Sequence, residues 1–295
     1  MTSSVLVPGA QLFTRKTGDG PALVLISGGG GDADMYDDVI PLLTSRYTVI
    51  TFDRRGNSRS PLTNDSAPVD PDTQAADVVA ILDHHGVDRA YVFGTSGSAI
   101  LTLALLGRHQ DRILGAVAHE PPLVQILPGS PEQQRIDELR HIADTEGPLC
   151  GFVAFAAMTM PNPPRLFEKR AGRVAFAGLM ALVLGVGRLW RTVTGKAPGG
   201  MARLVGNAGL TFRRELPAFC YDYEPDLAAL SAVTVPWRLA TGRDSVGRPY
   251  YRPAHVLGEK LGVPCVEFPG GHTSYQQYPA EFVGRLTEIL DELTP

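Results

Sequence analysis

Short apolar runs alternate with segments of helical periodicity along most of the chain. The apolar runs predict strands at residues 11–16, 22–26, 47–52, from 91 onward, 113–119, 237–241 and 265–268. The segments between them predict helices at residues 35–43, 72–85, 98–108, 253–261 and 280–293. Strands that are apolar throughout are covered on both faces, and strands that alternate with helices form parallel sheets. The pattern predicts an α/β fold with a mostly parallel, doubly wound sheet.

The alternation stops after Pro122 and resumes at Trp237. Between these points the chain shows helical patterns and loops rich in proline and glycine, but no clear strand. Such an interruption is typical of an insertion into a single α/β domain. We therefore predict a core domain made of residues 1–122 and 233–295, and a mostly helical cap domain at residues 123–232.

Composition and charge narrow the class of protein. Of the 295 residues, 44% are hydrophobic and 20% are charged, as in ordinary globular domains. The net charge of -4 gives no electrostatic reason to expect nucleic acid or an anionic membrane as a partner. The apolar stretch 174–186 is shorter than the 18 or so residues that a membrane span needs, and the N-terminus lacks signal-peptide character. We expect a cytoplasmic protein with no membrane partner.

The three cysteines are far apart, which argues against a disulfide framework and against a metal site of the CxxC type. The chain also shows no nucleotide-binding fingerprint. We therefore expect neither a metal nor a cofactor.

The most informative segment is the decapeptide from Tyr91 to Ile100, YVFGTSGSAI. An apolar strand ends in small residues and a helical pattern follows at once, which places Ser96 at the apex of a sharp turn. Such a turn is strained and needs small residues two positions before and after the serine, where Gly94 and Ser98 stand. The pattern predicts a serine nucleophile, although a phosphate-binding loop or a plain tight connection has a similar composition.

An activated serine needs a base, and the base needs a group that orients it. His272 is the best candidate base because it follows a late strand in a glycine-containing loop. Two residues are candidates for the acid. Glu120 ends an apolar strand next to that of Ser96, where an unpaired carboxylate would be costly. Asp244 follows the strand at 237–241. We favour Glu120, with Asp244 as the alternative.

Two backbone N–H groups usually stabilise the oxyanion of such a reaction. One would come from Gly97, directly after the serine, and the other from Gly29 in the run Gly28–Gly31. A phosphate loop is the other interpretation of this glycine run. It is disfavoured because no G-K-[ST] follows and the segment leads into Asp32 and Asp34, which would repel a phosphate.

Four motifs in order resemble the α/β-hydrolase superfamily. Ser27-Gly28-Gly29 looks like its oxyanion turn, with serine in place of histidine. Residues 53–60, DRRGNSRS, look like its D-x-R-G-x-G-x-S loop. Gly94–Ser98 is similar to the nucleophile elbow, and Gly271-His272 to the histidine loop. The resemblance covers residues 10–122 and 233–293, and it implies an α/β-hydrolase fold.

The resemblance also bears on the acid. The superfamily's common G-x-x-D pattern would place an aspartate at Ser245, and Asp244 is one residue early. The segment His119–Pro122 resembles the H-E-x-P of zearalenone-type lactone hydrolases, whose acid is a glutamate on the strand after the nucleophile helix. A dehalogenase or an epoxide hydrolase would need aspartate where Ser96 stands, so both activities are disfavoured.

These observations predict a serine hydrolase that cleaves an ester or a lactone through an acyl-enzyme. We expect an apolar small-molecule substrate and name its candidate contacts: Gly28, Thr95, Phe152, Phe155 and Met158. Apolar residues at helical spacing in the cap are also compatible with a homodimer. The alternatives are the same fold acting as an acyl transferase, a cyclase or a C–C hydrolase, and a binding protein without catalysis.

Overall fold

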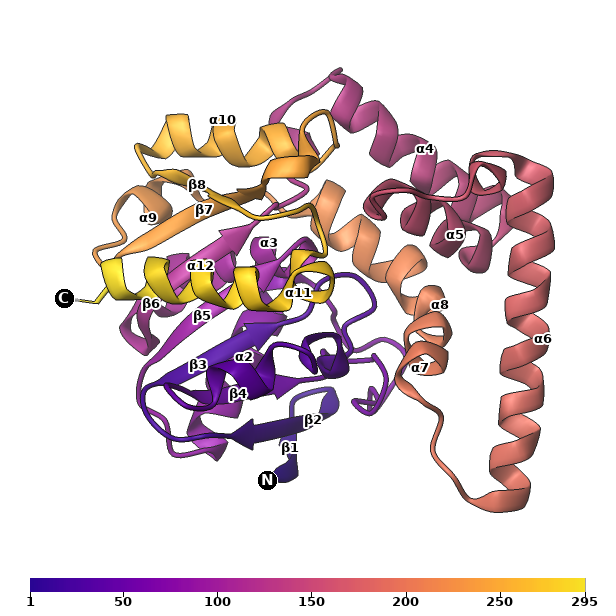
Figure 1. Ribbon diagram of the computed structural model, residues 1–295, viewed down its shortest axis with the longest axis horizontal. Coiled ribbons are helices and arrows are strands. Elements are labelled where there is room, and N and C mark those ends of the chain that lie inside the picture. The colour runs from indigo at the N-terminus through magenta and orange to yellow at the C-terminus, as the bar shows by residue number, and fades with distance from the viewer. Residues whose placement is uncertain (295) are drawn as a thin grey trace.

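The computed structural model describes residues 1–294 and contains one eight-stranded sheet. The strand order is β1-β2-β4-β3-β5-β6-β7-β8, and β3 to β8 run parallel (Figure 1). The strands span Thr2–Val7 (β1), Ala10–Thr17 (β2), Ala22–Ile26 (β3), Thr48–Phe52 (β4), Ala90–Thr95 (β5), Ile113–His119 (β6), Trp237–Gly242 (β7) and Cys265–Phe268 (β8). The predicted mostly parallel sheet is therefore confirmed.

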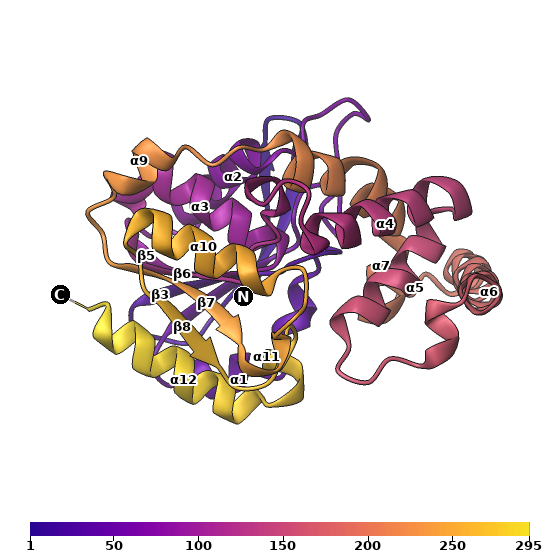
Figure 2. The same ribbon diagram turned by 90° about the horizontal axis from the view of Figure 1, so that it is seen from above.

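Helices cover both faces of the sheet, as Figure 2 shows from above. Pro71–His84 (α2), Gly97–His109 (α3) and Tyr251–Leu261 (α10) lie on one face. Ile40–Leu43 (α1), Ser274–Gln277 (α11) and Pro279–Glu292 (α12) lie on the other. A hydrophobic core lies on each face of the sheet, and alternate residues of β3 point into one or the other. Val24 packs with α2 and α3, whereas Leu23 and Leu25 pack with α12. This double burial explains why β3 is apolar throughout.

Only helices and loops lie between β6 and β7 in the described chain, and we call residues 123–232 the cap. Its helices are Pro131–Glu146 (α4), Pro148–Thr159 (α5), Arg170–Thr194 (α6), Gly200–Gly206 (α7), Ala208–Leu210 (α8) and Leu227–Ser231 (α9). Two π-helical turns, Thr211–Glu215 and Ala218–Asp222, continue from α8. In Figures 1 and 2 the helix α6 stands at the edge of the molecule farthest from the sheet.

Two local predictions differ from the structure. The helix predicted at 35–43 is divided into a 3₁₀ turn, Ala33–Tyr36, and the short α1, because Pro41 has no N–H to donate and fits only the first turn of a helix. The strand β1 was not predicted. It lies at the edge of the sheet, where Leu6 is exposed, so its apolar pattern is weak.

The expectation that no apolar segment reaches the length of a membrane span was wrong. The predicted stretch 174–186 is part of α6, which has 25 residues and contains an 18-residue window with a mean hydropathy of 1.5. The helix continues through Gly178, Gly185 and Gly187, since single glycines weaken a helix without ending it, and stops at Gly195 in the left-handed conformation. By length and composition alone, α6 is long enough to cross a membrane.

Candidate active site

Ser96 occupies the turn between β5 and α3 in a conformation that side chains rarely adopt, with φ of 58°. The turn demands a glycine at 94, because a Cβ there would lie 2.2 Å from the Thr102 hydroxyl and 2.3 Å from the Ser98 carbonyl. At the other flank Ser98 replaces the usual glycine, and its hydroxyl donates to the Ser27 carbonyl at 2.6 Å. The serine at 98 therefore ties the nucleophile helix to the glycine-rich loop.

The glycine-rich loop lies directly against Ser96. A Cβ on Gly28 would come within 3.0 Å of the Ser96 Cβ, so a side chain at Gly28 would push the loop away. Arg54 holds this loop from behind: its guanidinium donates to the Ser27 carbonyl at 3.0 Å and to the Gly28 carbonyl at 2.9 Å. Gly29 and Gly97, the two predicted oxyanion donors, line the same cavity as Ser96.

His272 and Glu120 meet at the carboxyl ends of the parallel strands. The His272 Nδ1 lies 2.5 Å from the Glu120 Oε2, and the Gly242 N–H donates to the Glu120 Oε1 at 2.7 Å. Glu120 itself has φ of 53°, an unusual conformation directly after β6 that directs its buried carboxylate toward the histidine loop. Two polar partners thus compensate the burial of this carboxylate.

The protonation states follow from this pairing. Burial acts to raise the pKa of Glu120, whereas the neighbouring His119 ring and the hydrogen bond from His272 lower it, and the net pKa lies below the usual value of 4.5. An ionised carboxylate accepts hydrogen bonds only, so the His272 Nδ1 carries a proton and donates it. In the neutral ring the Nε2 is then left as the proton acceptor that a general base requires.

Ser96 and His272 are not joined by a hydrogen bond in the described residues. Ser96 is held through its backbone instead, with its N–H donating to the His119 carbonyl at 2.8 Å. Hydrogen bonds between a nucleophile and its base are often long in the absence of substrate and tighten in the reacting complex.

The alternative acid lies elsewhere. Asp244 is exposed, and its backbone N–H donates to the Gly270 carbonyl at 2.8 Å. No ion pair of Asp244 occurs in residues 1–294, and its turn instead buries the neighbouring Ser245. The structure therefore brings Glu120, but not Asp244, to the histidine.

The cavity above Ser96 is small and apolar. Its volume is about 60 Å³, and its lining joins core and cap residues: Gly29, Arg54, Ser96, Gly97, Pro122, Ile136, Leu139, Phe155, Met158, Thr211, Phe212, Glu215, Leu216, Phe219, Cys220 and Tyr250. Two predicted substrate contacts, Phe155 and Met158, are among them. The other three are not: Gly28 packs against Ser96 and Thr95, the Thr95 hydroxyl is 3.0 Å from the His119 Nδ1, and Phe152 packs within the cap. Phe155 covers Gly29: a Cβ added to this glycine would lie 3.2 Å from the Phe155 ring.

Sequence reasoning missed three residues around this cavity. Tyr250 stacks on His272 with 3.8 Å between ring centroids. Nothing in the sequence around this tyrosine indicates that it contacts the histidine. Arg54 and Glu215 form a buried ion pair at 2.6 Å that joins the core to the cap. The arginine belongs to the 53–60 motif and was quoted without a role. An acid on an otherwise basic, apolar cap helix was a signal that a buried partner existed.

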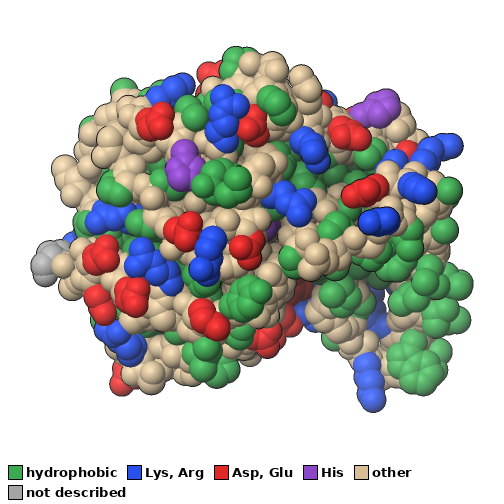
Figure 3. Space-filling model, turned by 45° about the horizontal axis from the view of Figure 1, so that its top comes forward, with side chains coloured by type: hydrophobic (Ala, Val, Ile, Leu, Met, Phe, Trp, Pro, Cys, Tyr) green, Lys and Arg blue, Asp and Glu red, His purple; other side chains and the backbone are tan. Residues whose placement is uncertain are grey.

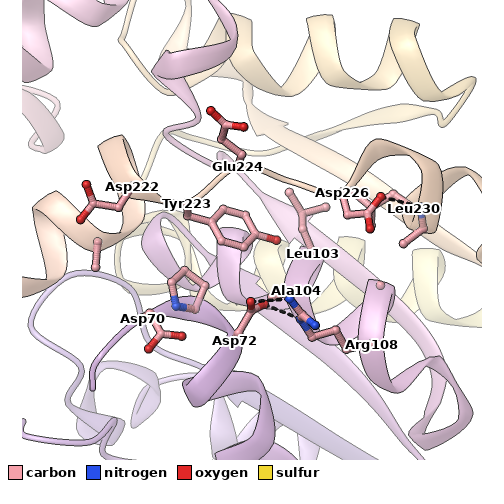
Figure 4. Close-up of a pocket in the computed structure, with 14 residues that line it drawn as sticks. Asp70, Asp72, Leu103, Ala104, Arg108, Asp222, Tyr223, Glu224, Asp226 and Leu230 are labelled. Atoms are coloured by element: carbon pink, nitrogen blue, oxygen red, sulfur yellow. Dashed lines mark hydrogen bonds and ion pairs between the residues drawn. The ribbon is translucent and has the colours of Figure 1, made fainter. Parts of the chain in front are cut away.

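A second cleft, of about 470 Å³, lies beside α2, α3 and α9, away from the triad candidates (Figure 4). Three of its carboxylates have structural roles. Asp70 and Asp226 accept from the first-turn N–H groups of α2 and α9, and Asp72 pairs with Arg108 at 2.6 Å. In the described residues no group of three His, Cys, Asp or Glu side chains is arranged to hold a metal.

Comparison with known proteins places these features in a family. The sequence model of the alpha/beta hydrolase fold matches residues 21–148. An uncharacterized hydrolase, YraK of Bacillus subtilis, is 32% identical over 290 residues, which cover 97% of this chain and 94% of the relative. A zearalenone hydrolase of Cladophialophora bantiana is 34% identical over 123 residues, 39% of this chain and 44% of the relative.

Among solved structures, a thermophilic esterase from Thermogutta terrifontis superimposes with a TM-score of 0.69. The match covers 100% of both chains at 18% identity, a level at which the likeness concerns the fold.

Proposed function

Because this chain belongs to the α/β-hydrolase family and is a hydrolase, we propose that it cleaves a carboxylic ester or lactone with Ser96 as nucleophile, His272 as base and Glu120 as acid. The observation that carries the proposal is the 2.5 Å hydrogen bond between His272 and Glu120, made at the sheet edge where Ser96 stands on its strained turn. This arrangement matches the requirement that a base be oriented by a third group.

In the first half of the reaction His272 takes the proton of the Ser96 hydroxyl through its Nε2. The serine oxygen attacks the carbonyl carbon, and the carbonyl oxygen becomes an oxyanion that the N–H groups of Gly29 and Gly97 stabilise. When the C–O bond of the ester breaks, His272 returns the proton to the leaving alkoxide. Glu120 keeps the ring in the Nδ1–H tautomer and stabilises its cation throughout.

In the second half a water molecule gives a proton to His272 and attacks the acyl-enzyme. The acid is released as the proton returns to the Ser96 oxygen, and the enzyme is restored. With a lactone the leaving alkoxide stays attached to the acyl group, so the product is a single hydroxy acid.

The cavity supports a substrate that is apolar near the reacting carbonyl. Apart from the Arg54–Glu215 pair, its side chains are mainly aliphatic or aromatic. Its volume of about 60 Å³ is far below the 300–1,000 Å³ typical of ligand pockets, so binding requires cap side chains such as Phe155 to move. The match to a zearalenone hydrolase supports including lactones in this class.

The test is hydrolysis of a panel of p-nitrophenyl esters and lactones by wild type and three variants. Replacing Ser96 by Ala is expected to lower kcat by about 10⁶-fold, as removal of a nucleophile does. Glu120→Gln is expected to cost about 10⁴-fold, the loss seen when a triad acid becomes its amide.

The matched control is Asp244→Asn, which makes the same chemical change in the exposed neighbouring loop. It should stay within about threefold of wild type, less than 1 kcal/mol of barrier. A large loss in Asp244→Asn with a mild effect of Glu120→Gln would refute our assignment of the acid. Equal rates for wild type and Ser96→Ala across the panel would refute the reaction itself.

A further inference from the structure

The outer face of α6 is apolar and exposed. Leu182, Val186 and Leu189 recur at spacings of three and four residues and are 64%, 60% and 66% exposed. The outer face of α6, as we use the term, consists of Leu179, Leu182, Val183, Val186, Leu189, Trp190 and Val193. Figure 3 shows hydrophobic side chains gathered at the right edge of the molecule, where α6 lies in Figure 1. Continuous apolar surfaces of this kind mark interaction sites.

The opposite face of α6 is fixed to the cap. Ala177 and Met180 are buried, and α6 packs against α5. Arg173, also buried, donates to Glu146 at 2.9 Å and 3.2 Å. These contacts hold the first half of α6 against the cap, whereas the residues beyond Met180 are mostly exposed. Crossing a bilayer would require these contacts to break, so the outer face is better suited to lie against a surface.

The charges along the segment 169–214, which contains α6 and α7, are of one sign. Residues 169–214 contain nine lysines and arginines and no aspartate or glutamate, whereas the remaining chain has 18 basic and 31 acidic residues. Lys169 at the start of α6, and Arg188, Arg191 and Lys196 near its end, are exposed. No ion pair of these four side chains occurs within residues 1–294. Lys169 and Lys196 therefore stand at the two ends of α6, and Arg188 and Arg191 line the space between α6 and α7; none of the four has an ion-pair partner in the described chain.

We propose that the outer face of α6 docks on the surface of a membrane that contains anionic phospholipids. The apolar side chains enter the boundary between headgroups and acyl chains, and the cations near the two ends of α6 pair with lipid phosphates, as in interfacial amphipathic helices. Trp190 is part of this face and is exposed, which suits the preference of tryptophan for the membrane interface.

A second copy of the chain fits this surface less well. Two α6 helices packed face to face would bring two basic segments together, with no acidic residue on either helix to compensate their like charge. An anionic lipid surface satisfies both the apolar face and its charges. The proposal concerns binding and does not depend on the reaction at Ser96.

The experiment uses the full-length protein and vesicles of phosphatidylcholine, with or without phosphatidylglycerol. Trp190 is 62% exposed and Trp237 is 5% exposed, so the emission change on binding reports on α6. We expect a blue shift with the anionic vesicles, its loss in Trp190→Phe, and co-sedimentation that weakens as salt increases. Replacing Arg188 or Arg191 by Gln should lower the partition coefficient roughly fivefold for each cation removed.

Two further variants distinguish a carboxylate placed on the outer face of α6 from one placed elsewhere on the surface. Val186→Asp places a carboxylate on the outer face and should abolish binding. Leu6→Asp makes a similar change at an exposed leucine of β1 and should bind as wild type, apart from the small effect of one added charge. Circular dichroism and thermal unfolding confirm that each variant is folded.

Several outcomes would overturn the proposal. One is an unchanged Trp190 emission and no co-sedimentation with anionic vesicles. Equal binding to vesicles without phosphatidylglycerol would refute the role of the anionic lipid. A dimer in sedimentation velocity that Val186→Asp dissociates, together with no vesicle binding, would assign the face to a second copy.

Discussion

The inner and outer sides of the cap differ in which side chains they bury and which they expose. On the inner side, charged and polar groups are buried and paired with the core: Glu215 with Arg54, and Arg203 with Asp32 at 2.9 Å. Asn207 also donates to the Gly30 carbonyl at 2.6 Å. On the outer side, along α6, apolar groups face solvent and cations lack partners in the described chain. The inner side makes its contacts within the chain, whereas the outer side leaves apolar side chains and cations without partners in the described residues.

The inner contacts also reach the candidate site. Arg54 holds the carbonyls of Ser27 and Gly28 with the same guanidinium that pairs with Glu215. The cap and the predicted oxyanion loop are therefore positioned by one side chain. A perturbation of the inner side should affect stability and turnover together, and a perturbation of the outer side should affect neither.

The largest expected effect comes from Glu215→Leu, which leaves the buried Arg54 without its carboxylate. Breaking a buried pair in this way typically costs about 3–5 kcal/mol, and we expect this loss in the free energy of unfolding measured with urea. The matched control is Glu288→Leu, which removes the partner of Arg285 from an exposed pair and should cost no more than about 1 kcal/mol.

The double variant Arg54→Met, Glu215→Leu sharpens this prediction. It removes both charges, so it should recover part of the stability that Glu215→Leu loses. If Glu215→Leu and Glu288→Leu lose the same amount, the inner ion pair does not hold the cap to the core.

A smaller loss is expected for Asn207→Ala. The side chain of Asn207 accepts from the Ser58 N–H at 2.9 Å and donates to the Gly30 carbonyl, so its removal leaves two backbone groups without partners. Each such group costs about 1–3 kcal/mol when it stays buried, and water that enters the space reduces the loss. Thermal unfolding of Asn207→Ala beside Thr192→Ala, on exposed α6, measures the difference. Equal midpoints would contradict the prediction.

Acid pH should lower the free energy of unfolding through the protonation of Glu120. The pKa of Glu120 is lowered in the folded protein, so its ionised form contributes stability at pH above the unfolded value, and the contribution is lost as the pH falls through the folded pKa. We expect the unfolding free energy of wild type to fall more steeply than that of Glu120→Gln between pH 6 and acid conditions. Parallel curves, measured by urea unfolding at each pH, would show that the carboxylate is not stabilised by folding.

The sequence predicts most of the sheet and the turn at Ser96, because these depend on local patterns. Apolar runs identify β3 and β5, and the small residues at 94 and 98 identify the sharp turn. The choice between Glu120 and Asp244 depends instead on which of two loops turns a carboxylate toward His272. That direction is set by the φ of 53° at Glu120, which no local pattern of residues encodes.

Long-range partners are the part that sequence reasoning could not reach. Arg54 and Glu215 are 161 residues apart, and Tyr250 reaches His272 only because the loop after β7 folds over the site. The length of α6 was underestimated for a different reason: glycines and an arginine interrupt its apolar composition, although they do not interrupt its hydrogen bonding. An apolar run in the sequence shows which residues avoid water, whereas the end of the helix is set by the backbone conformation at Gly195.

The smallest expected effect is on the stability contributed by α6 itself. Two residues of this helix that are two positions apart, and therefore on different faces, give the sharpest comparison. Leu182→Ala on the outer face should change the free energy of unfolding by no more than about 0.5 kcal/mol, since the side chain is exposed in the folded protein as well as in the unfolded chain. Met180→Ala, on the buried face of the same helix, removes packing against the cap and should cost at least about 2 kcal/mol. Urea unfolding without lipid measures both. Equal costs would mean that the outer face packs against protein in solution, and the contrast between the two sides of the cap would fail.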